Sequence, residues 1–169
     1  MFSYSTKMTF TFLLLLLSVS CSSVSEPQPQ KTATKTYTVK KVSDGDTFWI
    51  YNGTEKGEKI RLIGVDAPET QKSRRKEIGY YGEEAKAYLK QLLNSKNVRI
   101  EYDVSSKDQY GRTLAYVYLE DGTFVNAALV KNGYATVLTI PPNVKHAKEF
   151  VKLQQEAREN KRGLWGEIK

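Results

Sequence analysis

The chain has one cysteine and one histidine among its 169 residues, and these shortages exclude several kinds of chemistry. A single cysteine, Cys21, allows no disulfide within the chain and no zinc site built from several cysteines. A single histidine, His146, excludes mechanisms that need two histidines and disfavours a Ser-His-Asp triad. The main apolar run covers only residues 8–17, which is shorter than the roughly 20 residues that a membrane-spanning helix needs.

Acidic residues are also fewer than basic residues. The 19 Asp and Glu residues face 26 Lys and Arg residues, so the formal net charge is +7 and the isoelectric point is about 9.3. Such an excess indicates a polyanionic partner, either nucleic acid or an anionic membrane surface. Apolar residues make up 40% of the chain, which is enough to form a buried core. The length predicts one domain with a tail.

The N-terminal region is typical of an export signal. Lys7 precedes the apolar run, and small residues follow it as far as Cys21. We therefore interpret residues 1–20 as a signal peptide. The position of Cys21 resembles a bacterial lipobox, in which the cysteine is lipidated and anchors the protein to a membrane; the alternative is secretion as a soluble protein. Residues 21–35 are polar and contain two prolines, so we expect a disordered tether before a folded domain at 36–169.

The folded region alternates between strand and helix patterns. Period-2 alternation and β-branched residues predict strands, and Asp-Gly or Asn-Gly pairs mark the turns after the first two. Apolar residues at helical spacing predict about three α-helices, with Asn143 capping the last one, Val151 on its apolar side and Gly163 at its end. We predict strands at 37–42, 47–51, 59–65, 98–103 and 114–119, and helices at 83–93, 125–132 and 144–160. This order indicates an α+β fold built on a five-stranded OB-fold β-barrel.

Three segments could carry chemistry, although each has an ordinary structural explanation when taken alone. Residues 44–47 form a hairpin turn that could also direct a carboxylate towards a hard cation. Residues 61–70 form a strand and turn in which Arg61 shares a face with two aliphatic residues, so it lies at a rim or is kept for a charge. Residues 108–112 form a turn with an arginine.

Together, these segments are much more specific. VSDGDTF, RLIGVDAPET and DQYGRTLAY, in this order, resemble the staphylococcal nuclease (thermonuclease) family. The resemblance covers roughly residues 37–165 and extends to KEIGYYGEEA and the terminal GLW. It implies a calcium-dependent phosphodiesterase with an OB-fold that cuts DNA and RNA and leaves 3′-phosphate and 5′-hydroxyl ends.

The resemblance also implies a metal site. Carried over by motif, the calcium ligands are Asp46, Asp66 and the backbone carbonyl of Ala67. Members of the family often have threonine at the last position, and a backbone ligand should tolerate the change. Carboxylate and carbonyl oxygens are the hard donors that Ca²⁺ prefers, and they are poorly suited to zinc.

The remaining roles concern the substrate. The resemblance places Arg61 and Arg112 at the scissile phosphate, Glu69 as the general base for the attacking water, and Tyr110 near the bound nucleotide. Two guanidinium groups suit bidentate contacts with phosphate and stabilise charge that develops on its oxygens. We expect Asp44 to support the site or its turn without a direct role.

The sequence departs from the family pattern at Thr139, where members often carry a tyrosine near the substrate base, so base stacking is expected to differ there. The main alternative function is a non-catalytic surface module of the same fold that binds nucleic acid, and such modules lose the carboxylates or arginines. A surface adhesin for acidic polymers would explain the anchor and the charge but not the ordered motifs. No protein partner is implied, and we expect a monomer.

Overall fold

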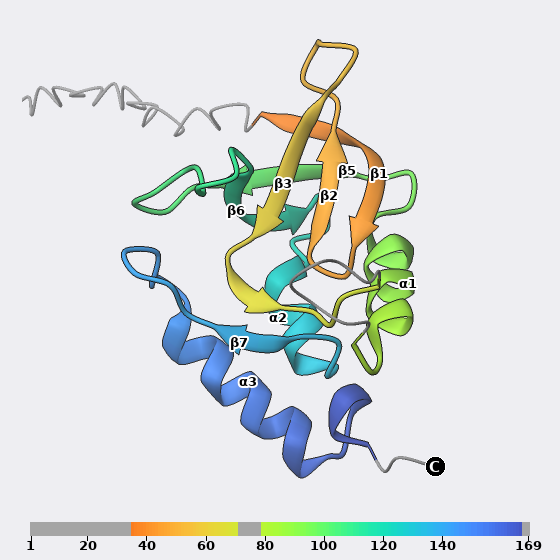
Figure 1. The fold of residues 1–169 in the computed structure, drawn as a ribbon, viewed down its shortest axis with the longest axis vertical. Coiled ribbons are helices and arrows are strands. Elements are labelled where there is room, and N and C mark those ends of the chain that lie inside the picture. The colour runs from red at the N-terminus through yellow and green to blue at the C-terminus, as the bar shows by residue number, and fades with distance from the viewer. Residues whose placement is uncertain (1–34, 71–78, 167–169) are drawn as a thin grey trace, which may run out of the picture. The chain divides into compact units, whose positions relative to one another are not determined.

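The predicted strands form a closed barrel in the computed structural model, which describes residues 35–70 and 79–166 (Figure 1). The order around the barrel is β1-β2-β3-β6-β5; the β3–β6 pair is parallel, and the other neighbouring pairs are antiparallel. The barrel strands are β1 (Thr36–Asp44), β2 (Thr47–Ile50), β3 (Glu58–Leu62), β5 (Asn97–Glu101) and β6 (Thr113–Leu119). This arrangement confirms the predicted α+β class and the five-stranded barrel.

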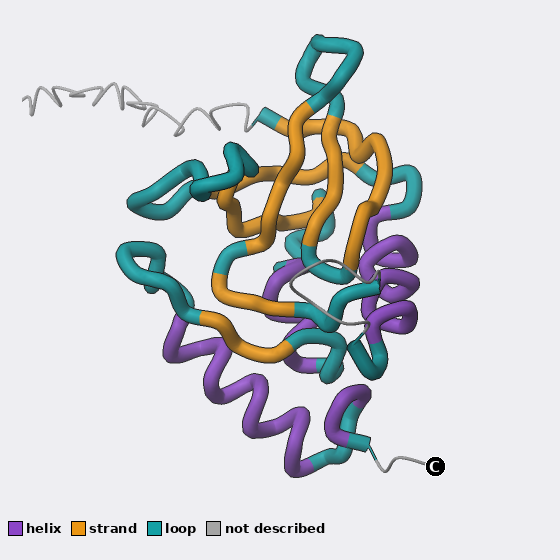
Figure 2. Tube along the Cα trace, in the orientation of Figure 1, coloured by secondary structure: helices purple, strands orange, loops and turns teal. Residues whose placement is uncertain are grey.

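Helices and a small second sheet complete the described region. The sheet pairs β4 (Gly64–Asp66) with β7 (Thr136–Leu138). Figure 2 shows α1 beside the barrel strands and the other two long helices next to the small sheet. The helices are α1 (Gly82–Leu93), α2 (Val125–Lys131), α3 (Ala147–Glu159) and the short 3-10 helix η1 (Gly163–Trp165). The three α-helices match the number predicted.

The barrel strands direct one face into the core and the other away from it. On β2, Phe48 and Ile50 are fully buried, and on β3 the same is true of Ile60 and Leu62. Since successive side chains of a strand point to opposite faces, the residues between them point outward. The outward face of β2 and β3 thus includes Arg61, and this alternation presents its charged group outside the core.

The turn between β1 and β2 is packed closely against the rest of the site. A Cβ atom on Gly45 would lie 2.6 Å from the Cβ of Ala67 and 2.9 Å from that of Ala85 in α1. Only glycine fits between these side chains without a shift of the backbone. This close packing therefore holds three segments together: the β1–β2 turn, the segment after β4, and the first turn of α1.

The predicted third strand, 59–65, is in fact two strands. The chain turns at Ile63 and Gly64, where Gly64 has a φ of +79°, a conformation that favours glycine. A Cβ there would also lie 2.5 Å from the ring of Phe150. The buried side chain of Asn126 accepts from the backbone N–H of Val117 and donates to the carbonyl of Ile63 at 2.8 Å, which satisfies the backbone at the break.

Three details predicted for the last helix are wrong. The helix begins at Ala147, and Asn143 is buried in the preceding loop, where its amide group bonds the backbone N–H and carbonyl of Ser105. Val151 is 55% exposed, so it does not belong to the packed side of the helix. The helix ends at Glu159 with Asn160 at its C-cap, and Gly163 instead opens the 3-10 helix.

The predictions for residues 1–20 and for Cys21 lie outside the described residues, as does nearly all of the predicted tether. Within 35–70 and 79–166, no helix is both long enough and apolar enough to cross a membrane.

Candidate active site

Asp46 is buried at the turn between β1 and β2, with every contact that an ionised carboxylate requires. One carboxylate oxygen accepts the hydroxyl of Thr47 at 2.9 Å, and the other accepts the backbone N–H of Ala67 at 2.9 Å. The second oxygen also lies 3.1 Å from Nη2 of Arg61. A buried charge is stable only when it is paired and hydrogen-bonded, and Asp46 meets both conditions.

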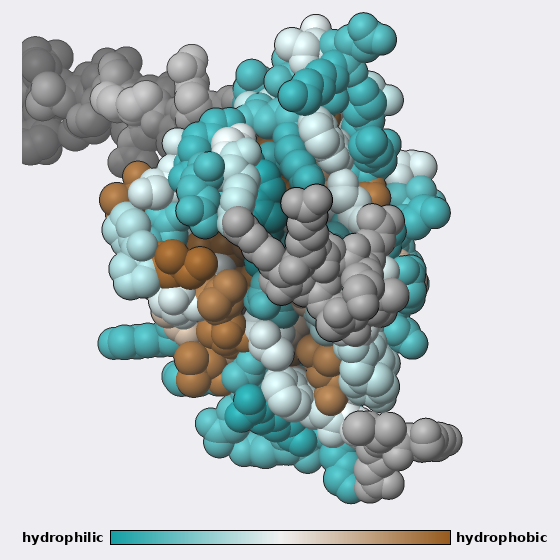
Figure 3. All heavy atoms as spheres, viewed as in Figure 1, coloured by the Kyte–Doolittle hydropathy of each residue, from teal (hydrophilic) through white to brown (hydrophobic). Residues whose placement is uncertain are grey.

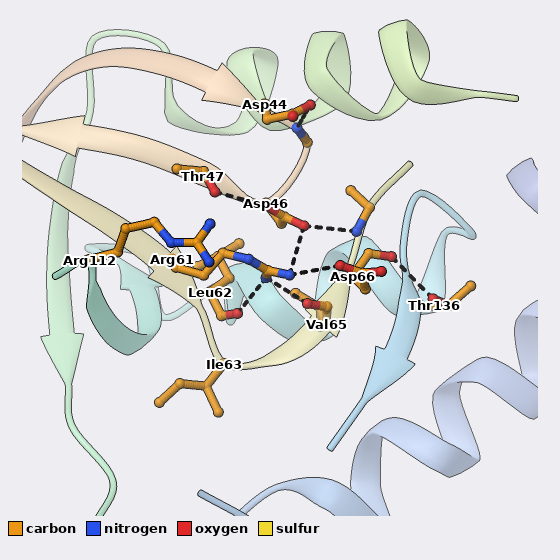
Figure 4. Close-up of polar contacts among 12 residues, drawn as sticks. Asp44, Asp46, Thr47, Arg61, Leu62, Ile63, Val65, Asp66, Arg112 and Thr136 are labelled. Atoms are coloured by element: carbon orange, nitrogen blue, oxygen red, sulfur yellow. Dashed lines mark hydrogen bonds and ion pairs between the residues drawn. The ribbon is translucent and has the colours of Figure 1, made fainter. Parts of the chain in front are cut away.

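Arg61 links the two carboxylates that the sequence singled out. Its Nη1 donates to the carbonyl of Leu62 at 2.9 Å and to that of Val65 at 2.6 Å. Its Nη2 donates to Asp66 at 2.8 Å and lies within ion-pair distance of Asp46 (Figure 4). The side chain is only 11% exposed. Arg61 is therefore fixed by four partners, as expected for an arginine kept for a charge.

The donor set fits a hard cation. Carboxylate oxygens of Asp46 and Asp66 come from two different segments, yet both lie next to the same positively charged nitrogen. Ala67 follows Asp66 directly and is buried beside Asp46. Among the described residues, no three His, Cys, Asp or Glu side chains lie close enough together to hold an ion. A cation at this place would thus combine the two carboxylates with backbone and solvent oxygens, a set typical of Ca²⁺.

A second arginine is positioned by the turn at 108–112. Asp108 accepts the backbone N–H groups of Tyr110 and Arg112 and pairs with Nε of Arg112 at 2.7 Å. Burial opposes ionisation of this carboxyl group, but the bonds from Arg112 outweigh it and lower the pKa of Asp108. The guanidinium also lies 5.5 Å from the ring centre of Tyr110. None of the described residues hydrogen-bonds to the terminal nitrogens of Arg112, which point towards Arg61 in Figure 4.

A cavity of about 440 Å³ brings Arg61, Asp66 and Arg112 together, whereas Asp46 is not among its described lining residues. Its polar side includes Arg61, Asp66 and Arg112, and Tyr110 is the aromatic residue among its described lining. The opposite side is aliphatic, and Figure 3 shows hydrophobic surface gathered at the left of this face. That side is formed by Leu138, Ile140, Pro141 and Pro142. Thr139 does not line the cavity within the described region, so the wall formed by this segment is aliphatic.

Glu69 lies next to Asp44, and it is not among the described lining residues of the cavity. The two carboxyl groups share a hydrogen bond, and burial of Asp44 together with this contact raises the pKa of Asp44 to about 6. Asp44 also accepts the backbone N–H of Gly45 at 2.9 Å. Its position agrees with the expected supporting role, because it contacts both the turn and the proposed general base.

Sequence reasoning missed two residues that organise the site. Asp108 positions Arg112, and its sequence signal was the spacing of an acidic residue four positions before an arginine within a turn. Asn126 is fully buried and supports the break before β4. It had no local signal, because its partners lie far away in the sequence.

Comparison with known proteins gives consistent matches. The model of the family described as staphylococcal nuclease homologue matches residues 59–167. A thermonuclease from Staphylococcus intermedius is 43% identical over 130 residues, which cover 77% of this chain and 76% of that protein. A thermonuclease from Staphylococcus hyicus is 42% identical, with 77% and 75% covered. Endonuclease YncB from Bacillus subtilis is 40% identical over 131 residues, with 76% and 60% covered.

Proposed function

The chain belongs to the staphylococcal nuclease family, and from this premise we propose that it is a calcium-dependent nuclease that hydrolyses DNA and RNA to products with 3′-phosphate and 5′-hydroxyl ends. One observation carries the proposal more than any other. Two carboxylates and Arg61 meet at the edge of a cavity that also contains Arg112 and Tyr110. The cavity thus combines a cation-binding group with two phosphate-binding groups and an aromatic ring.

Hydrolysis of a phosphodiester places negative charge on the phosphate oxygens as water attacks. Arg61 and Arg112 line the cavity from two different segments, so we place both at the same phosphate, where they stabilise this charge. The terminal nitrogens of Arg112 can bind it directly, whereas Arg61 would first have to release Asp46 or Asp66. Asp108 keeps the fork of Arg112 in place through its bond to Nε. Glu69 accepts the proton of the attacking water or orients that water.

Asp46, Asp66 and the carbonyl of Ala67 would hold the Ca²⁺ ion, which supplies positive charge that stabilises the developing charge on the phosphate. In the described structure, Arg61 pairs with both carboxylates and keeps them side by side, and its single charge leaves the group with one net negative charge.

The cavity offers a base one aromatic contact and one aliphatic contact, so a base that is free of its neighbours in a duplex fits it best. Tyr110 offers an aromatic ring that is 65% exposed, whereas the facing wall is formed by Leu138 and Ile140. Contacts with rings and aliphatic side chains depend little on base identity. We therefore propose that the enzyme accepts both DNA and RNA and prefers single strands.

This proposal predicts the products and the substrate preference. With calcium present, a single-stranded oligonucleotide should be cut faster than the same sequence in a rigid duplex, and labelling should identify 5′-hydroxyl and 3′-phosphate ends. Gel analysis of end-labelled strands measures both properties. Binding of the oligonucleotide without any cleavage would support the non-catalytic alternative, and equal rates on the two substrates would contradict the single-strand preference.

We further propose that the protein is exported and held at a membrane by a lipid on Cys21, and that it acts as a monomer. The support is the position of the sole cysteine directly after the apolar run. Cys21→Ser should move the protein to the soluble fraction without changing its specific activity, because Cys21 precedes the first barrel strand by fifteen residues (36 − 21). Partitioning into detergent measures this effect. Wild-type protein in the aqueous phase would indicate simple secretion.

A further inference from the structure

The outward face of the barrel carries an aromatic side chain between two lysines, next to Arg61 on the same face. The strand register pairs Lys41 of β1 with Trp49 of β2, and Trp49 with Lys59 of β3. The neighbouring pair towards the cavity is Thr47 with Arg61. Two residues along a strand span about 7 Å, so Trp49 and Arg61 lie close together on one surface, in the region where β1, β2 and β3 run side by side in Figure 1.

The contacts of these three residues form a cationic aromatic surface. The ammonium groups of Lys41 and Lys59 lie 5.5 Å and 5.9 Å from the ring centre of Trp49. The indole N–H donates to the hydroxyl of Ser43 at 3.0 Å, which fixes the orientation of the ring. In the part of the chain that the structure describes, no carboxylate forms an ion pair with either lysine. The positive charge beside the ring is therefore available to a ligand.

The core does not require this tryptophan. Its neighbours Phe48 and Ile50 on the same strand point inward and are fully buried, whereas Trp49 is half-buried on the outer face. The charge also continues past β1. A groove of about 320 Å³ between β1 and α1 is lined by Lys41 together with Lys86 and Lys90. The last two lie four residues apart on one helix, a spacing at which like charges repel.

We propose that Lys41, Trp49 and Lys59 bind a nucleotide of a single-stranded substrate that lies outside the catalytic cavity. The base stacks on the ring of Trp49 and displaces the lysine ammonium groups from it. The displaced ammonium groups then bind the adjoining phosphates of the same nucleic-acid strand. The groove beyond Lys41 accepts the continuing chain of phosphates. This inference rests on the proposed nuclease function and adds a second point of contact to it.

Binding and cleavage with substrates of two lengths test the proposal. The full chain is titrated in chelator with a labelled eight-residue oligodeoxythymidylate, and cleavage in calcium is measured with the same strand and with a dinucleotide. Trp49→Leu should weaken binding of the longer strand about ten-fold and raise its KM similarly, while kcat and dinucleotide cleavage stay unchanged. In the wild type, a base stacked on Trp49 should quench the tryptophan fluorescence. Trp49→Phe should retain most of the affinity but lose this quenching, because only Trp165 then remains.

The lysines are tested by salt dependence. Lys41→Gln with Lys59→Gln should reduce the slope of log Kd against log salt by about 1.4, since each phosphate contact in a single strand contributes about 0.7. Lys148→Gln with Lys152→Gln removes the same charge from exposed positions of α3 and should leave the slope unchanged.

Wild-type affinity for the longer strand in Trp49→Leu, or equal slopes in the two lysine pairs, would overturn the proposal. Loss of binding to phosphatidylserine vesicles with unchanged oligonucleotide binding would overturn it too and assign the surface to a membrane. A wild-type protein that binds the strand but cleaves neither substrate would contradict the nuclease function, and weaker binding by Trp49→Leu would then still support the binding surface.

Discussion

Arg112→Lys is expected to lower kcat on DNA by about 10²–10³-fold, which is the typical cost of removing one group that stabilises charge in the transition state. Lysine keeps the positive charge but loses the planar fork that binds phosphate in a bidentate manner. It also cannot bond Asp108 through Nε while presenting two further nitrogens to the cavity. Initial rates over a range of substrate concentrations separate kcat from KM.

Arg61→Lys should lose activity to the same extent, but it should also lower the melting temperature. Arg61 bonds two carbonyls and two carboxylates, and a single ammonium group cannot replace all four contacts. The lysine ammonium keeps the charge but leaves at least one of these partly buried acceptors without its partner, which is costly. Arg112 has a single carboxylate partner, so its variant should unfold close to the wild-type temperature.

Arg99→Lys is the matched control for both variants. Arg99 lies on β5 over the ring of Tyr118, with Glu101 at 3.6 Å, and it does not line the cavity. Its replacement should leave kcat near the wild-type value. Near-normal turnover in Arg112→Lys would mean that this arginine is structural and that the assignment of the phosphate-binding groups is wrong.

Asp46→Asn is expected to abolish most activity, by at least about 100-fold, because it removes a ligand charge from the proposed calcium site. The amide oxygen can still accept the N–H of Ala67, so the turn should stay folded. Calorimetric titration with calcium and measurement of kcat at saturating calcium distinguish lost affinity from lost chemistry.

Asp121→Asn provides the control for Asp46→Asn. Asp121 is an exposed residue that accepts the N–H of Thr123 in a turn, and its replacement removes the same charge without touching the cavity. Calcium affinity and turnover should be unchanged. If Asp46→Asn binds calcium as the wild type does, Asp46 is not a ligand.

The barrel could be predicted from the sequence because local patterns determine it. Alternation along the strands and helical spacing at Ala85, Leu89 and Leu93 match the buried faces that the structure shows. The break at Gly64 could not be predicted, since it depends on Phe150 and Asn126, which are distant in sequence. The cap at Asn143 failed for the same reason: its amide finds partners in Ser105 instead of in the helix that follows.

In the candidate site, too, the residues of local motifs could be predicted and the features that depend on distant segments could not. Asp46, Arg61 and Asp66 belong to motifs short enough to be recognised, and the structure places one oxygen of each carboxylate within 3.1 Å of Nη2 of Arg61. The aliphatic wall opposite Tyr110 was not predicted, because it depends on the path of the chain after β7. The Lys41–Trp49–Lys59 surface also required the register of three strands, which no single segment encodes.

If the carboxylates beside Arg61 hold a calcium ion that the proposed nuclease reaction needs, cleavage depends on free calcium. The most direct test is the initial rate of cleavage of single-stranded DNA by the purified protein as free calcium is varied, with a chelator at one end of the series. We expect no cleavage in chelator, saturable activation by calcium, and full recovery when calcium is added back. Magnesium should activate poorly, because it requires a tighter octahedral set of ligands and retains its water. Undiminished turnover in chelator would contradict the account.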